Sequence, residues 1–155
     1  MTALAAHRAV KKRNDSKPTQ GAHLIETSAI VFEGSFLVAD QTTGLLKVAA
    51  DLGVTASTFA GICTGFIYHT SIPDTGVVGN GTILAKFETD IEVLVPCAAS
   101  VTAADSGNTA YLLDDEGTTD VSTAGPACGV FMPGHQEATL TAWVRLGAVA
   151  LPDAT

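Results

Sequence analysis

The sequence predicts an all-β protein: a β-sandwich or barrel-like domain of about nine or ten short strands, preceded by an extended basic N-terminal arm. Three observations carry this prediction. Charged residues make up only 15% of the 155 residues, fewer than the outer faces of solvated helices require. Turn-forming sequences recur about every 8–12 residues. The clearest segments alternate apolar and polar residues with a period of two, and strands do not alternate with helical segments.

Residues 1–21 are predicted to form the arm. Residues 3–10 could make two helical turns, but that is shorter than the roughly 12–15 residues that an isolated helix needs in water. Residues 14–21 are polar and include Pro18 and Gly21, which favour an extended or disordered linker. The predicted organisation is therefore an arm over residues 1–21, a body over 22–147 and a tail over 148–155.

The body is predicted to consist of short strands rich in β-branched and aromatic residues. Turn sequences separate them, for example at residues 40–44 and 73–76. Residues 98–108 are ambiguous between a short helical turn and a loop. The predicted strands occupy residues 27–32, 35–39, 45–49, 59–68, 83–95, 110–113, 118–122, 129–132 and 139–146.

The segment 83–95 is the clearest strand. One set of alternate positions is β-branched or aromatic, and Glu88, Asp90 and Glu92 share the opposite face. Acids two positions apart on a strand are separated by roughly 7 Å, which is within the spacing of the paired carboxylates of glycosidases. A small hydrolase built on these three acids is therefore one alternative. A strand face with three acids more often faces water or a basic partner.

No catalytic, cofactor or metal constellation is found. Cys63, Cys97 and Cys128 form no C-x-x-C pair and lie in apolar surroundings, so they are predicted to be buried free thiols. The four histidines are scattered without metal-ligand spacing and are predicted to lie at the surface or in loops. The acidic run 114–116 is predicted to be a solvated hairpin turn, because a calcium site needs converging oxygens at alternating positions. We therefore expect a protein that is not an enzyme.

Charge is divided unevenly along the chain. Residues 1–20 carry five basic residues against one acid, a net charge of +4, and the other 135 residues carry three basic residues against fifteen acids, a net charge of −12. The arm can bind an acidic patch of a protein neighbour, bind nucleic acid, or act as a solubilising tail. Stable nucleic-acid binding is the weakest of these, because the arm has no aromatic residue and the body is acidic. The candidate partner-binding residues are Arg8, Lys11, Lys12, Arg13 and Lys17.

No membrane partner is expected. No apolar run approaches the roughly 20 residues that span a bilayer, and residues 1–7 lack the pattern of a signal peptide. The sequence therefore predicts synthesis in the cytoplasm of the cell that makes it.

Residues 26–147 resemble the small cement or decoration proteins of tailed-bacteriophage capsids. The resemblance lies in the order of segments along the chain. It begins with a Gly-x-Phe-Leu-Val strand that ends in an acidic turn, and it closes with an Ala-Trp-Val-Arg-Leu strand. The segments that carry it are residues 34–40, 59–62, 87–95, 107–115, 129–131 and 142–146.

The resemblance implies a structural, head-stabilising protein on the outer surface of the virion, made in the host cytoplasm. Such proteins sit at symmetry axes, often as trimers, and clamp neighbouring major capsid subunits. The implied partners are thus the major capsid protein and further copies of this chain. The basic arm would reach acidic capsid or neighbouring cement surfaces, and it is longer and more basic than this layout requires.

A β-sandwich module that binds a ligand such as a glycan is the other alternative. Such a module needs exposed aromatic side chains near its loops, and Tyr68, Tyr111 and Trp143 are the Tyr and Trp residues that the sequence offers.

Overall fold

The computed structural model describes residues 4, 6–13, 18–48, 57–67 and 72–147, and this part of the chain is all-β. The predicted fold class is confirmed. The helical segments within the described residues are single 3-10 turns, η3 (Ala103–Asp105) and η4 (Glu137–Thr139). The strands are β1 (Lys11–Arg13), β2 (Thr19–Leu24), β3 (Ile30–Val31), β4 (Phe36–Asp40), β5 (Leu46–Val48), β6 (Ser57–Ile67), β7 (Val77–Val78), β8 (Leu84–Thr89), β9 (Glu92–Pro96), β10 (Thr109–Leu112), β11 (Thr118–Thr119), β12 (Ala127–Gln136) and β13 (Thr141–Leu146).

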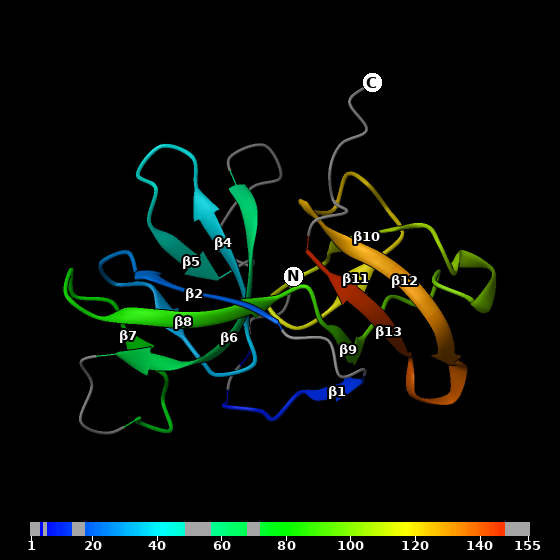
Figure 1. Ribbon diagram of the computed structural model, residues 1–155, viewed down its shortest axis with the longest axis horizontal. Helices are drawn as coiled ribbons and strands as arrows, with labels where there is room; N and C mark the ends of the chain where they lie inside the picture. The colour runs from blue at the N-terminus through cyan, green and yellow to red at the C-terminus, as the bar shows by residue number, and fades with distance from the viewer. Residues whose placement is uncertain (1–3, 5, 14–17, 49–56, 68–71, 148–155) are drawn as a thin grey trace.

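These strands form two antiparallel sheets and a ribbon. Sheet A has the order β1-β9-β13-β12-β10-β11, sheet B has the order β2-β8-β6-β4-β5, and β3 pairs with β7 in a two-stranded ribbon. In Figure 1 sheet B lies on the left and sheet A on the right, with β1 along the lower side of the molecule. The N-terminal strand β1 therefore belongs to the sheet that is otherwise formed by the second half of the chain.

Two hydrophobic cores hold the layers together, and β4 contributes to both. Phe36 and Val38 pack with the buried side chains of sheet A, whereas Leu37 packs with the ribbon and the opposite face of sheet B. All three are fully buried. Because successive side chains of a strand point to opposite faces, an uninterrupted apolar run is what a strand between two packed layers requires. Sheet B is thus the middle layer at this strand.

The chain crosses from sheet B to sheet A between β8 and β9. The prediction of one continuous strand over residues 83–95 is wrong at this point, because β8 ends at Thr89 and β9 begins at Glu92 in the other sheet. Asp90 has a φ of 60°, a left-handed conformation that Asp tolerates better than most residues. The Asp90 N–H donates to the Leu146 carbonyl at 3.0 Å, and the Leu146 N–H donates to the Ile91 carbonyl at 2.8 Å. Alternation continues through the turn, which explains why the sequence reads as one strand.

The N-terminal region is built into the sheets. β1 pairs with β9 in the register Lys11 to Leu94 and Arg13 to Glu92. The predicted boundary between arm and body, at residues 21 and 22, falls inside β2, which pairs with β8 over its whole length. The described residues between 6 and 10 contain no helix. We keep the name "arm" for residues 4–13, of which residue 5 lies outside the described part.

Candidate functional site: the arm and its acidic groove

The acids at the crossover receive the cations of the arm. Lys12 Nζ lies 2.6 Å from Glu88 Oε2 on β8, and Arg13 Nε lies 2.9 Å from Glu92 Oε2 on β9. Glu88 and Glu92 are only 8% and 5% exposed, and a buried carboxylate without a partner is costly. Two consecutive arm residues therefore neutralise one buried acid in each sheet.

The end of the arm also rests on an aromatic ring. The guanidinium carbon of Arg13 lies 4.4 Å from the ring centroid of Trp143, and Arg13 Nη1 donates to the Pro133 carbonyl at 3.0 Å. Trp143 is on β13 and is buried. A guanidinium stacked on Trp gains a cation–π attraction of about 0.5–2 kcal/mol. Arg13 is thus held by the Glu92 carboxylate, the Pro133 carbonyl and the Trp143 ring.

Arg8 occupies the other end of the same surface. Its Nη2 donates to the carbonyls of Gly34 and Glu116 at 2.9 and 3.1 Å, and its Nη1 lies 3.7 Å from Glu116 Oε2. Burial lowers the pKa of Arg8, and the carboxylates of Glu116, Asp114 and Asp115 oppose this effect. The pKa of an Arg starts so high that the side chain stays charged at neutral pH.

Gly34 is needed where Arg8 crosses it. It has a φ of +87°, and a Cβ at this position would lie 2.4 Å from Arg8 Cγ and 2.8 Å from the Arg8 carbonyl oxygen. Glycine adopts this conformation without penalty and leaves the space that the arm fills.

His7 and Leu4 add neutral contacts. The Glu33 N–H donates to His7 Nδ1 at 2.9 Å, so in the neutral ring the proton is on Nε2, which donates to the Pro73 carbonyl at 2.8 Å. The ring of His7 packs edge-on against Phe32 with centroids 5.2 Å apart. The Leu4 N–H donates to a carboxylate oxygen of Asp115 at 3.2 Å.

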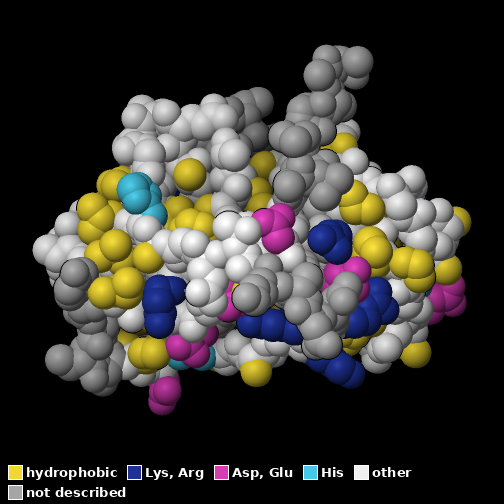
Figure 2. Space-filling view, in the orientation of Figure 1, with side chains coloured by type: hydrophobic (Ala, Val, Ile, Leu, Met, Phe, Trp, Pro, Cys, Tyr) yellow, Lys and Arg dark blue, Asp and Glu magenta, His cyan; other side chains and the backbone are white. Residues whose placement is uncertain are grey.

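We call the surface that receives residues 4–13 the arm groove. Figure 2 shows Lys and Arg side chains beside Asp and Glu side chains across the lower centre and right of this face, where β1 runs in Figure 1. The groove is formed by Phe32, Glu33, Gly34, Pro73, Glu88, Glu92, Asp115, Glu116, Pro133 and Trp143, together with the edge of β9.

The structure brings together three of the five predicted arm cations. Arg8, Lys12 and Arg13 bind the body of their own chain, whereas Lys11 is exposed on β1 and has no ion pair among the described residues. Lys17 lies outside the described residues. No sequence pattern identified His7 or Trp143 as an arm contact. The sequence signal for the ion pairs was the uneven charge, since the 135 residues after the arm carry fifteen acids and only three basic residues.

The acids proposed for a hydrolase are engaged in other contacts. Glu88 accepts from Lys12 and from the Gln20 amide at 3.2 Å, Glu92 accepts from Arg13, and Asp90 accepts from the Thr19 hydroxyl at 2.5 Å. Within the described residues no group of three or more His, Cys, Asp or Glu side chains is placed to hold a metal ion. The three acids act as anchors for the N-terminal residues in this structure.

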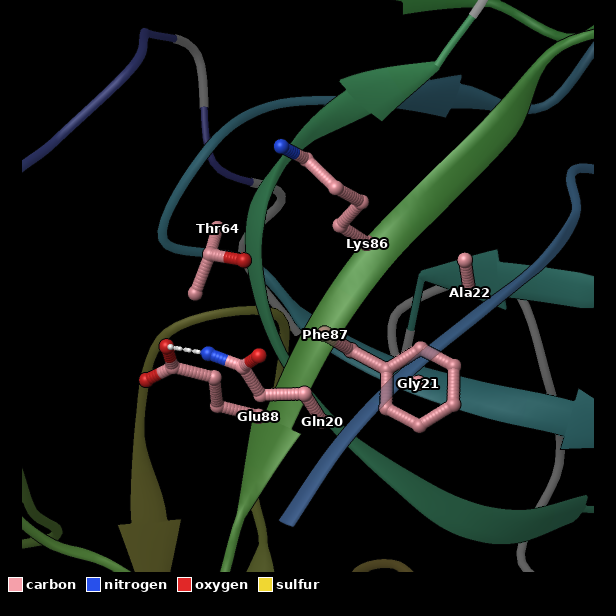
Figure 3. Close-up of a pocket in the computed structure, with 7 residues that line it drawn as sticks. All are labelled: Gln20, Gly21, Ala22, Thr64, Lys86, Phe87 and Glu88. Carbon is pink, nitrogen blue, oxygen red and sulfur yellow. Dashed lines mark hydrogen bonds between the residues drawn. The ribbon is translucent and has the colours of Figure 1, made fainter. Parts of the chain in front are cut away.

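A shallow depression lies beside β2 and has a volume of about 440 Å³. Figure 3 shows the Gln20 amide bonded to Glu88, with Lys86 extended away from that pair and the Phe87 ring beside Gly21. A smaller hollow of about 200 Å³ runs along Arg8–Val10, and both hollows share Thr64 on β6. Both hollows are open, and charged, polar and apolar side chains line them.

The three cysteines are free and buried, as predicted. Burial raises the pKa of the Cys63 thiol to about 12 and raises the pKa values of Cys97 and Cys128 as well. Thiols of this kind stay protonated and are poor nucleophiles near neutral pH.

The aromatic residues considered for glycan binding are not displayed as a platform in the described part. Trp143 is buried beneath Arg13 and Tyr111 is half-buried. Tyr68 lies outside the described residues. None of the helical segments in the described part of the chain has the length and apolar character needed to cross a membrane.

Comparison with solved structures gives a fold relationship. No protein-family model matches the sequence, and no curated protein matches it. Among solved structures, the chain is similar to a chain of the capsid of Myoviridae phage XM1, with a TM-score of 0.55 and 17% sequence identity. The similarity covers 94% of this chain and 92% of that chain. The all-β architecture described above is thus shared, over nearly the full length, with a chain of a phage capsid.

Proposed function

We propose that this chain is a structural virion protein that decorates the outer surface of a phage head and cements it by bridging major capsid subunits. The observation that carries the proposal is the near full-length similarity in fold to a phage capsid chain. Coverage of more than nine-tenths of both chains means that the whole architecture is alike, rather than a β-hairpin or a single sheet.

The chemistry of the surface supports a binding role rather than catalysis. The buried acids at the crossover are neutralised by the arm, the buried thiols are held protonated, and the hollows are open. The acidic body, with a net charge of −12, is repelled by the phosphate backbone of packaged DNA and suits a position on the outside of a shell.

A cement protein needs to bind the assembled lattice better than separate subunits. Simultaneous contact with two or more subunits raises the effective affinity even when each contact is weak, and a ligand that binds the intact shell stabilises it by mass action. In this proposal the chain acts as a homo-oligomer, a trimer, at a symmetry axis. Of the arm cations proposed as partner contacts, Lys11 is exposed and free of ion pairs in the described residues, so it can meet an acidic neighbour without rearrangement.

Co-sedimentation tests the proposal. Heads of the virus that encodes this chain, assembled without it, are incubated with the purified full chain and centrifuged, and an equal amount of unassembled capsid subunits serves as the control. We expect saturable retention on heads, little binding to free subunits, and a higher temperature of head disruption. A folded chain that stays in the supernatant at all head concentrations would exclude the cement role.

A further inference from the structure

The arm lies on the body in the manner of a bound peptide. It combines strand pairing between β1 and β9 with cationic anchors at both ends, Arg8 at Gly34 and Glu116 and Arg13 at Glu92 and Trp143. Addition of an extended segment to a sheet edge, with side-chain pockets that give specificity, is a general mode of peptide recognition. The arm groove is therefore a peptide-binding site whose occupant, in this structure, is the chain's own N-terminal segment.

The groove is made without residues close to the arm in sequence. In the described part of the arm, the hydrogen bonds, strand pairing, ion pairs and ring contacts are with residues 32–34, 73, 88, 92–94, 115–116, 133 and 143. Residues 14–18 are the whole covalent connection between β1 and β2. An identical arm from another molecule can thus make every one of these contacts.

The groove is chemically matched to the arm, and a second copy of this chain carries an identical arm. The groove presents the half-buried Glu116 to Arg8 and the buried Glu88 and Glu92 to Lys12 and Arg13, with the Trp143 ring under Arg13. When an arm leaves its own groove, Glu88 loses the Lys12 contact and Glu92 loses Arg13. A neighbour's arm restores both, so the arm makes the same contacts whichever copy supplies it.

We propose that the arm groove binds the arm of a second copy of this chain, so that neighbouring copies are joined by reciprocal exchange of residues 4–13. The tether between β1 and β2 sets an effective concentration in the millimolar range for the arm on its own body. Exchange therefore becomes competitive when copies are crowded to similar local concentrations. This property belongs to the isolated chain and does not depend on a role in a virion.

A disulfide placed in the strand register tests the exchange with full-length chains. Lys11 on β1 and Leu94 on β9 are directly paired, and directly opposite residues in an antiparallel pair have Cα separations that a disulfide can bridge. One chain carries Lys11→Cys and a second carries Leu94→Cys, and the two are refolded together at about 1 mM and oxidised. The native thiols do not compete, because all three are buried.

The matched control replaces the second chain by one with Ser122→Cys. Ser122 is exposed and follows β11, at the opposite edge of sheet A from β1. We expect the disulfide that joins position 11 of one chain to position 94 of another, measured by mass spectrometry of non-reduced digests, to exceed the control disulfide at least tenfold. Random collision gives no such excess, because Leu94 is less exposed than Ser122.

A chain with both Lys11→Cys and Leu94→Cys completes the test, because it reports whether the register is correct. Closure within this chain, together with no excess of the disulfide between positions 11 and 94 of different chains over the control disulfide, means that the arm binds only its own body, and the proposal is overturned. Failure of the double variant and of the mixture to form the disulfide overturns it as well, since the arm then does not lie along β9. Excess disulfide between chains supports exchange.

Discussion

Lys12 on β1 and Glu88 on β8 connect the two sheets of this protein, because Lys12 belongs to sheet A by strand pairing and its ammonium lies 2.6 Å from a carboxylate of sheet B. The next residue, Arg13, binds Glu92 within sheet A. The Asp90–Ile91 crossover that separates the two acids is thus spanned twice, once by the covalent chain and once by the arm.

Replacement of Lys12 by Ala tests the energetic weight of this connection. Among the described residues, Glu88 is then left buried with only the Gln20 amide as a hydrogen-bond donor. We expect a loss of about 1 kcal/mol in the free energy of unfolding, since Lys12 is partly exposed and its charge is screened by solvent. Urea denaturation measures this loss. The control is Lys11→Ala, which removes the same charge from an exposed position without an ion pair in the described residues and should cost less than about 0.5 kcal/mol. Equal effects of the two substitutions would contradict a specific role for Lys12.

The close approach of the arm to Gly34 gives a second prediction. Gly34→Ala forces a side chain into a left-handed conformation, at a cost of about 1–2 kcal/mol, and places its Cβ 2.4 Å from Arg8 Cγ. Gly44→Ala has the same backbone problem, with a φ of +74°, but its Cβ would meet nothing within 4 Å.

We therefore expect Gly34→Ala to lower the free energy of unfolding by at least about 1 kcal/mol more than Gly44→Ala. The excess should be accompanied by increased protease cleavage within the arm, because Arg8 is displaced. Indistinguishable stabilities and cleavage rates would mean that the arm does not depend on the space above Gly34.

Thiol labelling checks the packing of both cores. Cys63 lies in the core between sheet B and the ribbon, and Cys97 and Cys128 lie in the core with sheet A. Because burial raises the pKa of each thiol, we expect no reaction with a thiolate-specific reagent at pH 8 in the native state and complete reaction of all three in denaturant. Rapid native labelling of Cys97 alone would indicate that the sheet A core opens locally near β9.

The fold class could be predicted from the sequence because it depends on local signals. Low charge, frequent turns and period-two alternation correspond to the short strands of the structure. In β4, burial on both faces corresponds to an unbroken apolar run from Phe36 to Val38. The division of residues 83–95 could not be predicted, because Asp90 interrupts the strand without interrupting the alternation of apolar and polar residues. The crossover is set by tertiary hydrogen bonds to Leu146, which no local pattern encodes.

The charged residues of the candidate site could be predicted from the sequence, but their positions relative to one another could not. The sequence identified the cations of the arm and the acids of the body, but it placed Glu88, Asp90 and Glu92 together on one strand face. In the structure Glu88 and Glu92 lie in different sheets, and each binds a different arm residue. The role of Trp143 depends on the pairing of β13 with β9, a contact between residues about fifty positions apart, so no spacing in the sequence reveals it.

Stability should depend on pH through Asp40 at the turn between β4 and β5. The Thr42 N–H donates to its carboxylate at 2.7 Å, and this bond, with those from Thr43 and Lys47, lowers the pKa of Asp40 against an opposing effect of burial. A carboxyl whose pKa is lower in the folded state contributes stability above its unfolded pKa and loses it as the pH falls through the folded value. Asp40→Asn should therefore be less stable than the parent chain at pH 7, and the difference should shrink below about pH 4.

Thermal unfolding from pH 7 to pH 2.5 measures this convergence for Asp40→Asn. Asp74→Asn is the matched control, because Asp74 is exposed and makes no hydrogen bond or ion pair among the described residues. It removes the same charge without the turn contacts, so its difference from the parent chain should be small at every pH. A difference for Asp40→Asn that is constant from pH 7 to pH 2.5 would show that the amide fails to replace the turn geometry, and that the charge of Asp40 adds nothing.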